Sequence, residues 1–341
     1  MAWLSIWDHL HLASTHWNTW LKKVHISAVS ASILVNRKGR RFLIFRYTKR
    51  KSPDKSGLFF YAMATDKIII QGELGCFHEE AALKYFGENG HAFVPAQSFP
   101  DLAVHLDDNP KDHVAIMAIE NSIAGSLLQN YRILREHDYR VVGEVYLRIK
   151  HNLMALPGQG IGDIKEVHSH PMALNQCLVY LREKEMKMVE SADTALSAKR
   201  ICESQSSGVA AIASRRAAQI YGLEILAAGI ETSKVNYTRF FIVQTKDKPV
   251  PPTHVNKASI YLRVVDGRGK LLKVLDAINR HDINLSKLQS YPVLGELSRY
   301  YFHLDLEFDD LSEFEACLSE LKDCTDSLEV LGTYQKAEIN D

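Results

Sequence analysis

Residues 114–125 read VAIMAIENSIAG: six apolar residues followed directly by Glu120, Asn121 and Ser122. An apolar run of this length fits a strand, and similar runs alternate with helical patterns after residue 63, which indicates an α/β layered fold. Polar side chains at the carboxyl end of such a strand face the crevice where ligands bind. The three residues are therefore candidate site residues, although locally Asn121 and Ser122 could simply cap the next helix.

The alternation divides residues 63–247 into two lobes. In the first lobe we expect strands at 67–71 and 114–119 and helices at 79–86 and 127–135. In the second lobe we expect strands at 140–147, 153–155 and 208–213 and helices at 171–185 and 192–204.

A linker and a small domain follow the two lobes. Residues 245–256 read TKDKPVPPTHVN, and their three prolines favour extended backbone, so we place a linker at 248–257. Residues 258–336 then show strand and helix patterns in the order βαββαβ. That order predicts a ferredoxin-like domain.

The composition is that of a soluble globular protein. Of 341 residues, 46% are hydrophobic and 24% charged, which excludes collagenous, disordered and membrane-spanning classes. The five cysteines form an odd set without a CxxC pair. Free thiols in a reducing compartment explain this set better than disulfides, so we expect a cytoplasmic location.

Residues 1–62 differ from the rest, with eleven Lys/Arg against two Asp and with all four tryptophans. Their longest apolar run, at 26–35, is too short to span a bilayer. The basic stretch at 37–55 lacks a fold to display it, so we expect neither nucleic acid nor membrane as a partner. We interpret residues 1–62 as an extension outside the two-lobed fold, with a natural start at Met63.

A glycine-rich turn, GELGCFHEEAA at 72–82, joins the first strand to a helix. The free N–H groups at such a helix start suit a carboxylate or phosphate, which makes Gly75, Cys76 and Phe77 candidates for binding such an anion. The alternative is a tight turn that needs glycine only for its dihedral angles.

Residues 167–177, VHSHPMALNQC, begin a helix at Pro171. Ser169 and Gln176 lie about two turns apart, so their polar groups can converge, and His170 lies at the helix start. His168, His170 and Cys177 would also fit a metal site or a cysteine nucleophile, but no second ligand cluster or activating partner accompanies them.

Residues 236–240, NYTRF, run into another strand. The Thr238 hydroxyl can donate a hydrogen bond, and the Arg239 guanidinium can bind a carboxylate with two parallel bonds. On residue types alone, the two side chains could equally form a surface ladder pair.

In this order the four segments resemble prephenate dehydratases across residues 67–336. The resemblance rests on the glycine-rich opening, IENSxxG at 119–125, SHPxALxQC at 169–177, and TRF at 238–240. It implies a two-lobed, periplasmic-binding-like catalytic domain with chain crossings near 140–146 and 223–230. Thr238 and Arg239 of the first lobe would then face Ser169 and Gln176 of the second.

The implied reaction converts prephenate to phenylpyruvate, water and carbon dioxide without a cofactor or metal. Thr238 would assist the leaving hydroxyl, while Arg239 and the helix start at 75–77 would bind the two carboxylates. Asn121, Ser169 and Gln176 would orient the substrate, with Ser122 and His170 lining its site. Glu120 could act as an acid if protonated.

The C-terminal domain resembles ACT domains, which implies phenylalanine as an effector bound between subunits of a homodimer or homotetramer. The matching positions are Gly269, Leu271, Asn284, Leu285 and Ser290. At positions 289 and 291 the ACT motif has two charged residues, one of each sign, whereas this chain has the uncharged Gln289 and Tyr291. An ACT domain that only dimerises is the alternative. For the whole chain, the alternatives are an arogenate dehydratase and a non-catalytic amino-acid-binding module.

Overall fold

The computed structural model describes residues 26–35, 41–49, 67–88, 90–250, 254–264, 267–293, 295–296 and 299–339. The chain divides into two compact units, residues 1–60 and 61–341. In the first unit, β1 (Ile26–Val35) and β2 (Arg41–Lys49) form an antiparallel pair. No helix in the described part of the chain is long and apolar enough to cross a membrane. Met63, the predicted start, lies outside the described residues.

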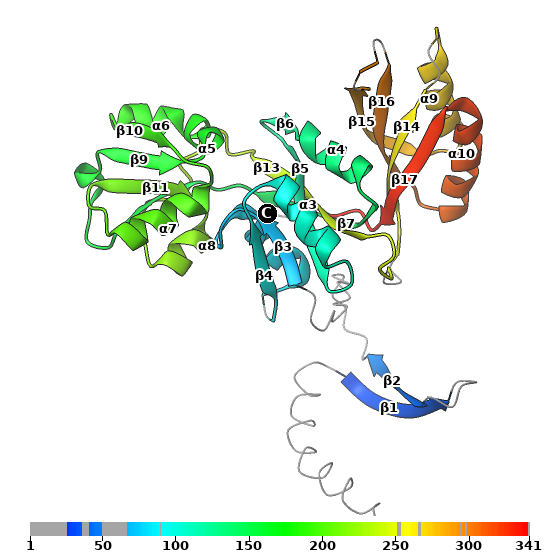
Figure 1. Ribbon diagram of the computed structural model, residues 1–341, viewed down its shortest axis with the longest axis horizontal. Helices are drawn as coiled ribbons and strands as arrows, with labels where there is room; N and C mark the ends of the chain where they lie inside the picture. The colour runs from blue at the N-terminus through cyan, green and yellow to red at the C-terminus, as the bar shows by residue number, and fades with distance from the viewer. Residues whose placement is uncertain are drawn as a thin grey trace, which may run out of the picture. The chain divides into compact units, whose positions relative to one another are not determined.

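The first lobe of the second unit is built on a mixed sheet with the strand order β4-β3-β5-β13-β7, and β6 pairs with β5 (Figure 1). Its strands are β3 (Lys67–Gln71), β4 (Ala92–Ala96), β5 (His113–Asn121), β6 (Gly125–Ser126), β7 (Tyr139–Arg148) and β13 (Tyr237–Thr245). Its helices are α2 (Phe77–Phe86), α3 (Phe99–Asp108) and α4 (Leu128–Glu136). The sequence patterns did not predict β4 or α3.

Alternate residues of this sheet enter two different cores. Ile68 and Ile70 pack in one core with α2, and Ile69 packs in the other with α3 and α4. The pairing of β5 with β13 shifts register between Arg239 and Phe240, so that Ile119 forms a bulge. The bulge reverses the side on which each residue of β5 after Ile119 lies.

The second lobe has a five-stranded sheet with the order β10-β9-β11-β8-β12. Its strands are β8 (Asn152–Ala155), β9 (Glu166–Ser169), β10 (Lys187–Glu190), β11 (Val209–Ala213) and β12 (Glu224–Ala227). Its helices are η1 (Ile161–Asp163), α5 (Pro171–Gln176), α6 (Leu178–Glu183), α7 (Thr194–Ser204) and α8 (Arg215–Tyr221). The single helix expected at 171–185 is divided at Cys177 into α5 and α6.

The chain crosses between the lobes twice, but not where the sequence suggested. The prediction of a crossing at 140–146 is wrong, because these residues belong to β7 inside the first-lobe sheet. The first crossing is at 149–151, between β7 and β8. The second is at 228–236, because β12 still pairs with β8 of the second lobe, so the expected 223–230 began too early.

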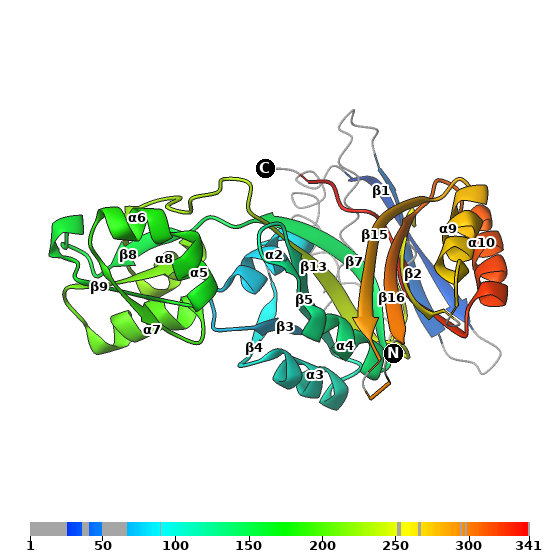
Figure 2. The same ribbon diagram turned by 90° about the horizontal axis from the view of Figure 1, so that it is seen from above.

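The C-terminal domain has the predicted βαββαβ order, with the antiparallel sheet β15-β16-β14-β17. Its elements are β14 (Lys257–Arg263), α9 (Lys270–Arg280), β15 (Asn284–Pro292), β16 (Tyr300–Glu307), α10 (Leu311–Cys324) and β17 (Ser327–Tyr334). Both helices lie on the same side of the sheet (Figure 2). The opposite face packs on the first lobe, where Tyr291, Leu331 and Tyr334 share a core with α3 and α4.

Candidate active site

The site begins at a cross-strand pair, Asn121 at the end of β5 and Thr238 at the start of β13. Asn121 Nδ2 donates to Thr238 Oγ1 over 3.0 Å. Asn121 Oδ1 accepts from the backbone N–H groups of Ile123 and Ala124, at 3.0 and 2.9 Å, which fixes the orientation of the amide. Because the Thr238 oxygen accepts this bond, its own hydrogen can be donated to a substrate oxygen.

Three further residues extend this pair to the second lobe. Asn236 Oδ1 accepts from Asn121 Nδ2 at 2.8 Å, and Asn236 Nδ2 donates to Gln176 Oε1 at 2.9 Å. His151 Nε2 lies 2.7 Å from the same Gln176 oxygen. We call these five residues, Asn121, His151, Gln176, Asn236 and Thr238, the interlobe cluster. It links the first lobe and both crossings to the carboxyl end of α5.

His151 is held as a neutral donor. Gln176 Oε1 accepts both bonds, so the histidine must carry its hydrogen on Nε2, which leaves Nδ1 as an acceptor. Burial lowers the pKa of His151, and its Nδ1 is buried without a hydrogen-bond partner among the described residues. The cluster therefore offers amides, a hydroxyl and a neutral imidazole, a set suited to orienting and donating to a polar substrate.

His151 and Asn236 were missed by the sequence reasoning. Asn236 is the first residue of the segment NYTRF, two residues before Thr238, and its position at the end of a crossing could have drawn attention to it. His151 carries no such signal, because the crossing it occupies was expected at 140–146. Each residue is almost fully buried, which an isolated sequence pattern does not reveal.

The glycine-rich turn contacts the second lobe closely. Gly75 has φ +88°, and a Cβ placed there would lie 2.6 Å from the Cα of Ala217. Ser214 Oγ, which caps α8, donates to the Gly75 carbonyl at 2.6 Å. The Gly75 N–H donates to Glu79 Oε2 at 2.6 Å. The expectation that this N–H binds a substrate carboxylate is therefore wrong, because a carboxylate of the chain already occupies it.

The residues after Gly75 divide between core and site. Cys76 is 2% exposed and belongs to the core, so its predicted contact with substrate is wrong, and burial raises the pKa of its thiol. Phe77 is half-buried, and its ring lies edge-on to His151 with 5.5 Å between centroids. His78 Nε2 accepts from the Ala118 N–H at 3.3 Å, next to the bulge of β5. Of these three, only Phe77 adjoins the cluster.

Arg239 was expected beside Thr238 in the pocket, and this prediction is wrong. Adjacent residues of a strand point to opposite faces, so Arg239 points away from Thr238. Its buried guanidinium bonds to Glu144 Oε2 at 2.6 Å and forms an ion pair with Asp305 of the C-terminal domain. Glu120, the cross-strand partner of Arg239, also faces away and pairs with Lys287 Nζ at 2.9 Å.

Ser169 does not join the cluster. Its side chain is fully buried, and its hydroxyl donates to the Ile212 carbonyl at 2.6 Å inside the second lobe, so its predicted role with substrate is wrong. Ser122 fastens the second crossing, because its hydroxyl accepts from the Tyr237 N–H and donates to the Val235 carbonyl. His170 caps α5 through its ring, which accepts from the Met172 N–H at 3.2 Å.

The metal and cysteine alternatives receive no geometric support. No group of three or more His, Cys, Asp or Glu side chains that could hold a metal occurs within the described ranges. His168 lies 3.4 Å from Glu166, apart from His170 and its cap. Burial raises the pKa of the Cys177 thiol, which opposes formation of a nucleophilic thiolate.

The residues expected to bind an effector lie around β15 and the start of α9. Gly269 caps α9 with φ +74°, and Leu271 follows in its first turn. Asn284 Nδ2 donates to Glu307 Oε2 at 3.1 Å, and Gln289 Nε2 donates to the Ser290 carbonyl. Leu285 packs against the core of the domain. Tyr291 is buried against the first lobe, 5.6 Å from the Tyr131 ring.

Comparisons with known proteins agree on one family. Residues 68–248 match the family model described as prephenate dehydratase. The chain is 33% identical over 278 residues to the bifunctional chorismate mutase/prephenate dehydratase of Aquifex aeolicus, a match covering 81% of this chain and 75% of that protein. It is 34% identical over 284 residues to arogenate dehydratase/prephenate dehydratase 1 of Arabidopsis thaliana, covering 79% and 71%.

A solved structure gives the same result. Prephenate dehydratase from Arthrobacter aurescens, in complex with L-Phe, is similar with a TM-score of 0.71 at 26% identity, and the match covers 79% of this chain and 90% of that one. The chain belongs to the prephenate dehydratase family, whose relatives are lyases acting on prephenate or arogenate.

Proposed function

We propose that this chain is a prephenate dehydratase, which makes phenylpyruvate in phenylalanine biosynthesis, and that the interlobe cluster is its active site. The observation that carries the proposal is the bond from Asn121 Nδ2 to Thr238 Oγ1, continued through Asn236 to Gln176. It brings together groups that are far apart in the sequence and lie on opposite lobes. Neither a helix cap nor a surface ladder pair would require that connection.

The reaction needs help mainly at the leaving hydroxyl. The bond from the ring to its carboxylate breaks and releases carbon dioxide, and its electron pair enters the ring as the C–O bond breaks. Hydroxide leaves and takes up a proton to become water. Hydrogen-bond donation to that oxygen contributes roughly two to four orders of magnitude to such a step. Thr238 is the donor, since Asn121 fixes its oxygen and leaves its hydrogen free.

The two carboxylates of prephenate need partners other than Arg239. Arg216, at the start of α8, reaches the glycine-rich turn, where its Nε lies 2.9 Å from Glu79 Oε1. Its side chain is 39% exposed, so the guanidinium keeps donors for a second carboxylate. We assign Arg216 the carboxylate-binding role first expected of Arg239.

Arogenate is the second candidate substrate, because the Arabidopsis relative is named for both activities. Arogenate has an amino group where prephenate has a keto group, and the elimination is otherwise the same. None of the five cluster side chains is a carboxylate, the group that would favour an ammonium over a carbonyl. Glu231 contacts His151, but its Oε2 already accepts from the His151 backbone N–H at 2.9 Å. We therefore expect higher kcat/KM with prephenate.

The test is turnover of the purified full chain with each substrate, following phenylpyruvate spectroscopically and phenylalanine by chromatography. Thr238→Val keeps the shape but removes the hydroxyl, and it should lower kcat by about 10²- to 10⁴-fold. Thr238→Ser keeps the hydroxyl and is the matched control. No turnover of either substrate by the wild type would overturn the proposal, and near-normal turnover by Thr238→Val would remove Thr238 from the mechanism.

We further propose that the C-terminal domain is an ACT domain that binds phenylalanine in a cytoplasmic homodimer or homotetramer. Its βαββαβ order and the similarity to a relative solved with L-Phe support this proposal. Isothermal titration with phenylalanine, alongside sedimentation of the chain, tests it. Absence of both heat and inhibition would leave a domain that only assembles subunits.

A further inference from the structure

Two neighbouring cross-strand pairs lie at the site, and they face opposite sides of the sheet. Asn121 and Thr238 pair on the side of the interlobe cluster, and Glu120 and Arg239 pair on the other side. The bulge at Ile119 produces this arrangement, because it brings Glu120 to the side that Arg239 occupies. Each pair therefore moves with the other, since they share the same two backbone segments.

The C-terminal domain holds the outer pair at both ends. Lys287 of β15 binds Glu120 at 2.9 Å and donates to Ser126 at 2.9 Å. Asp305 of β16 pairs with the Arg239 guanidinium. The Lys287 side chain is 10% exposed, and the Asp305 side chain is fully buried. The Arg239–Asp305 pair is thus shielded from solvent and is stronger than a surface ion pair. The Glu120 side chain is 38% exposed, so the Lys287–Glu120 pair is only partly shielded.

The Arg239 contact is part of a larger buried network. Glu144 binds both Arg239 and Lys257, and Asp305 also accepts from Ser259 Oγ at 2.6 Å. Burial opposes ionisation of Asp305, but the neighbouring Arg239 guanidinium holds the pKa of its carboxyl well below the ordinary value. Removing one charge from such a network leaves another charge buried without a partner, which is costly. The network therefore holds the C-terminal domain firmly against the first lobe.

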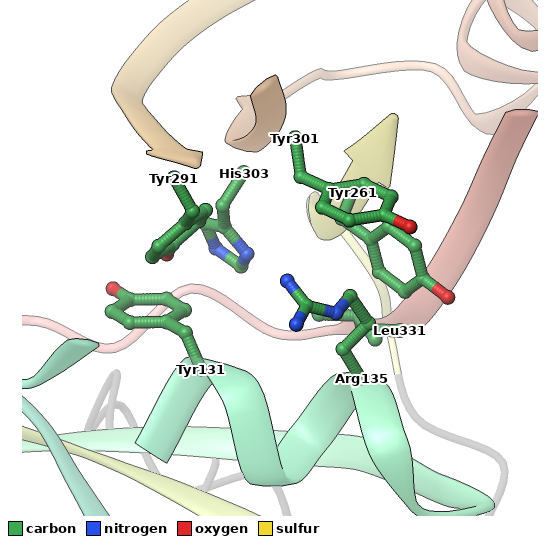
Figure 3. A pocket seen from close by; sticks show the side chains of 7 residues that line it. All are labelled: Tyr131, Arg135, Tyr261, Tyr291, Tyr301, His303 and Leu331. Carbon is green, nitrogen blue, oxygen red and sulfur yellow. The ribbon is translucent and has the colours of Figure 1, made fainter. Parts of the chain in front are cut away.

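Aromatic residues complete the contact around these charges. Figure 3 shows Tyr131 and Arg135 of α4 facing Tyr291 and His303 of the C-terminal sheet across a cavity of about 10 Å³, room for about one water molecule. Lys287 Nζ lies 5.7 Å from the Tyr131 ring centroid, and His303 lies 3.1 Å from Asp305. The small cavity indicates that the contact is tightly packed.

We propose that Lys287 and Asp305 are positioning residues, which set the placement of Asn121 and Thr238 through Glu120 and Arg239. This inference rests on the proposed function of the interlobe cluster. Lys287 lies on β15 between the predicted effector residues Asn284–Leu285 and Gln289–Ser290. An amino acid bound along β15 thus acts on the site through the Lys287–Glu120 pair, a direct physical connection between effector and Thr238.

Lys287→Met tests this connection with little loss of packing, because methionine keeps the apolar stem. Asp305→Asn strands the buried Arg239 and risks unfolding, so it is not the primary variant. Lys246→Met is the matched control: Lys246 pairs with Glu329 of β17 at 2.5 Å, which is also a contact to the C-terminal domain, but it follows the far end of β13.

The first readout is kinetic. Lys287→Met should lower kcat about 3- to 30-fold with a smaller change in KM. It should also raise the phenylalanine concentration for half inhibition about tenfold. Lys246→Met should change each value by less than about twofold.

In a double-mutant cycle, adding Glu120→Gln to Lys287→Met should have little further effect, since both remove the same contact. Additive effects would overturn the proposal.

The second readout needs neither substrate nor effector. Amide hydrogen exchange of residues 119–124 and 236–240 should become faster in Lys287→Met than in the wild type, and Lys246→Met should leave it unchanged. Unchanged exchange in Lys287→Met would overturn the positioning role even for a chain that processes neither prephenate nor arogenate. The failure of this inference is thus separable from the failure of the proposed function, which the wild-type assay decides.

Discussion

The Asn121 amide donates to Thr238 Oγ1 over 3.0 Å, across the antiparallel pairing of β5 and β13. The same Nδ2 is 2.8 Å from Asn236 Oδ1, so a single amide group orients the hydroxyl and connects it to the second lobe. Asn121 Oδ1 meanwhile holds the turn that follows. The two ends of this side chain therefore have separable tasks.

Asn121→Asp separates these tasks. The carboxylate keeps an acceptor for Ile123 and Ala124, but it cannot donate to Thr238 or Asn236. We expect kcat to fall by about 10²-fold, the scale of removing one positioned donor. Asn121→Ala removes the turn bonds as well, so it should lower both kcat and the melting temperature. Wild-type kcat in Asn121→Asp, measured with prephenate, would show that Thr238 needs no orienting bond.

The sequence motifs predicted which residues belong to the site better than they predicted which side of the sheet each side chain faces. Asn121, Gln176 and Thr238 belong to one chain of hydrogen bonds, because Asn121 and Gln176 end their elements and Thr238 lies near the start of β13, all between the lobes. Thr238 and Arg239 were expected on the same side, which the alternation of a strand forbids. Glu120 and Asn121 change sides because of a bulge at Ile119, and nothing in VAIMAIENSIAG signals that extra residue.

The glycine-rich turn shows a second limit of sequence reasoning. Its backbone N–H groups were expected to receive a substrate carboxylate, and the helix-start argument is sound in general. Here Glu79, four residues after Gly75, binds the Gly75 N–H itself, and Arg216 of the second lobe binds Glu79. A partner from a distant segment decides this contact, so a local pattern could not predict it.

Gly332→Ala should weaken the attachment of the C-terminal domain. A Cβ at Gly332 of β17 would lie 1.9 Å from the Val141 carbonyl oxygen of β7, a backbone atom that cannot move aside easily. We expect the free energy of unfolding to fall by more than about 3 kcal/mol, beyond ordinary overpacking.

The control for this prediction is Gly162→Ala. A Cβ at Gly162 has no neighbour within 4 Å, so the change should stay within about 0.5 kcal/mol. Urea unfolding of both variants measures the difference. Equal stabilities would show that β17 does not approach β7 as closely as the structure indicates.

His78 predicts a specific pH dependence of stability. Burial lowers its pKa to about 3, below the ordinary value of 6.5. As the pH falls below 6.5, the His78 imidazole therefore becomes protonated in the unfolded chain but stays neutral in the folded chain. The stabilising contribution is complete above pH 6.5 and is lost toward pH 3, by about 1.4 kcal/mol per pH unit.

His78→Gln isolates this contribution, because glutamine keeps an acceptor for the Ala118 N–H but does not titrate. Urea unfolding at several pH values from 7.5 to 4.5 should give a shallower loss in the variant than in the wild type. Burial also lowers the pKa of His151 and of His303, so some acid sensitivity should remain. Parallel curves for the two proteins would contradict a buried, neutral His78.

Gly75 tests whether the lobes must approach each other at the glycine-rich turn. Gly75 and Gly158 both have positive φ, +88° and +85°, so alanine carries a conformational cost of about 1–2 kcal/mol at each. Only Gly75 has a neighbour in the way: its Cβ would lie 2.6 Å from the Ala217 Cα of the second lobe. Gly75→Ala should therefore hold the lobes apart and stretch the bonds that Gln176 makes to His151 and Asn236. We expect kcat/KM to fall more than about tenfold in Gly75→Ala. Gly158→Ala, which carries a similar conformational cost, should keep the wild-type kcat/KM. Equal kcat/KM in the two variants would mean that catalysis does not require this contact, and that the cluster forms by another closure of the lobes.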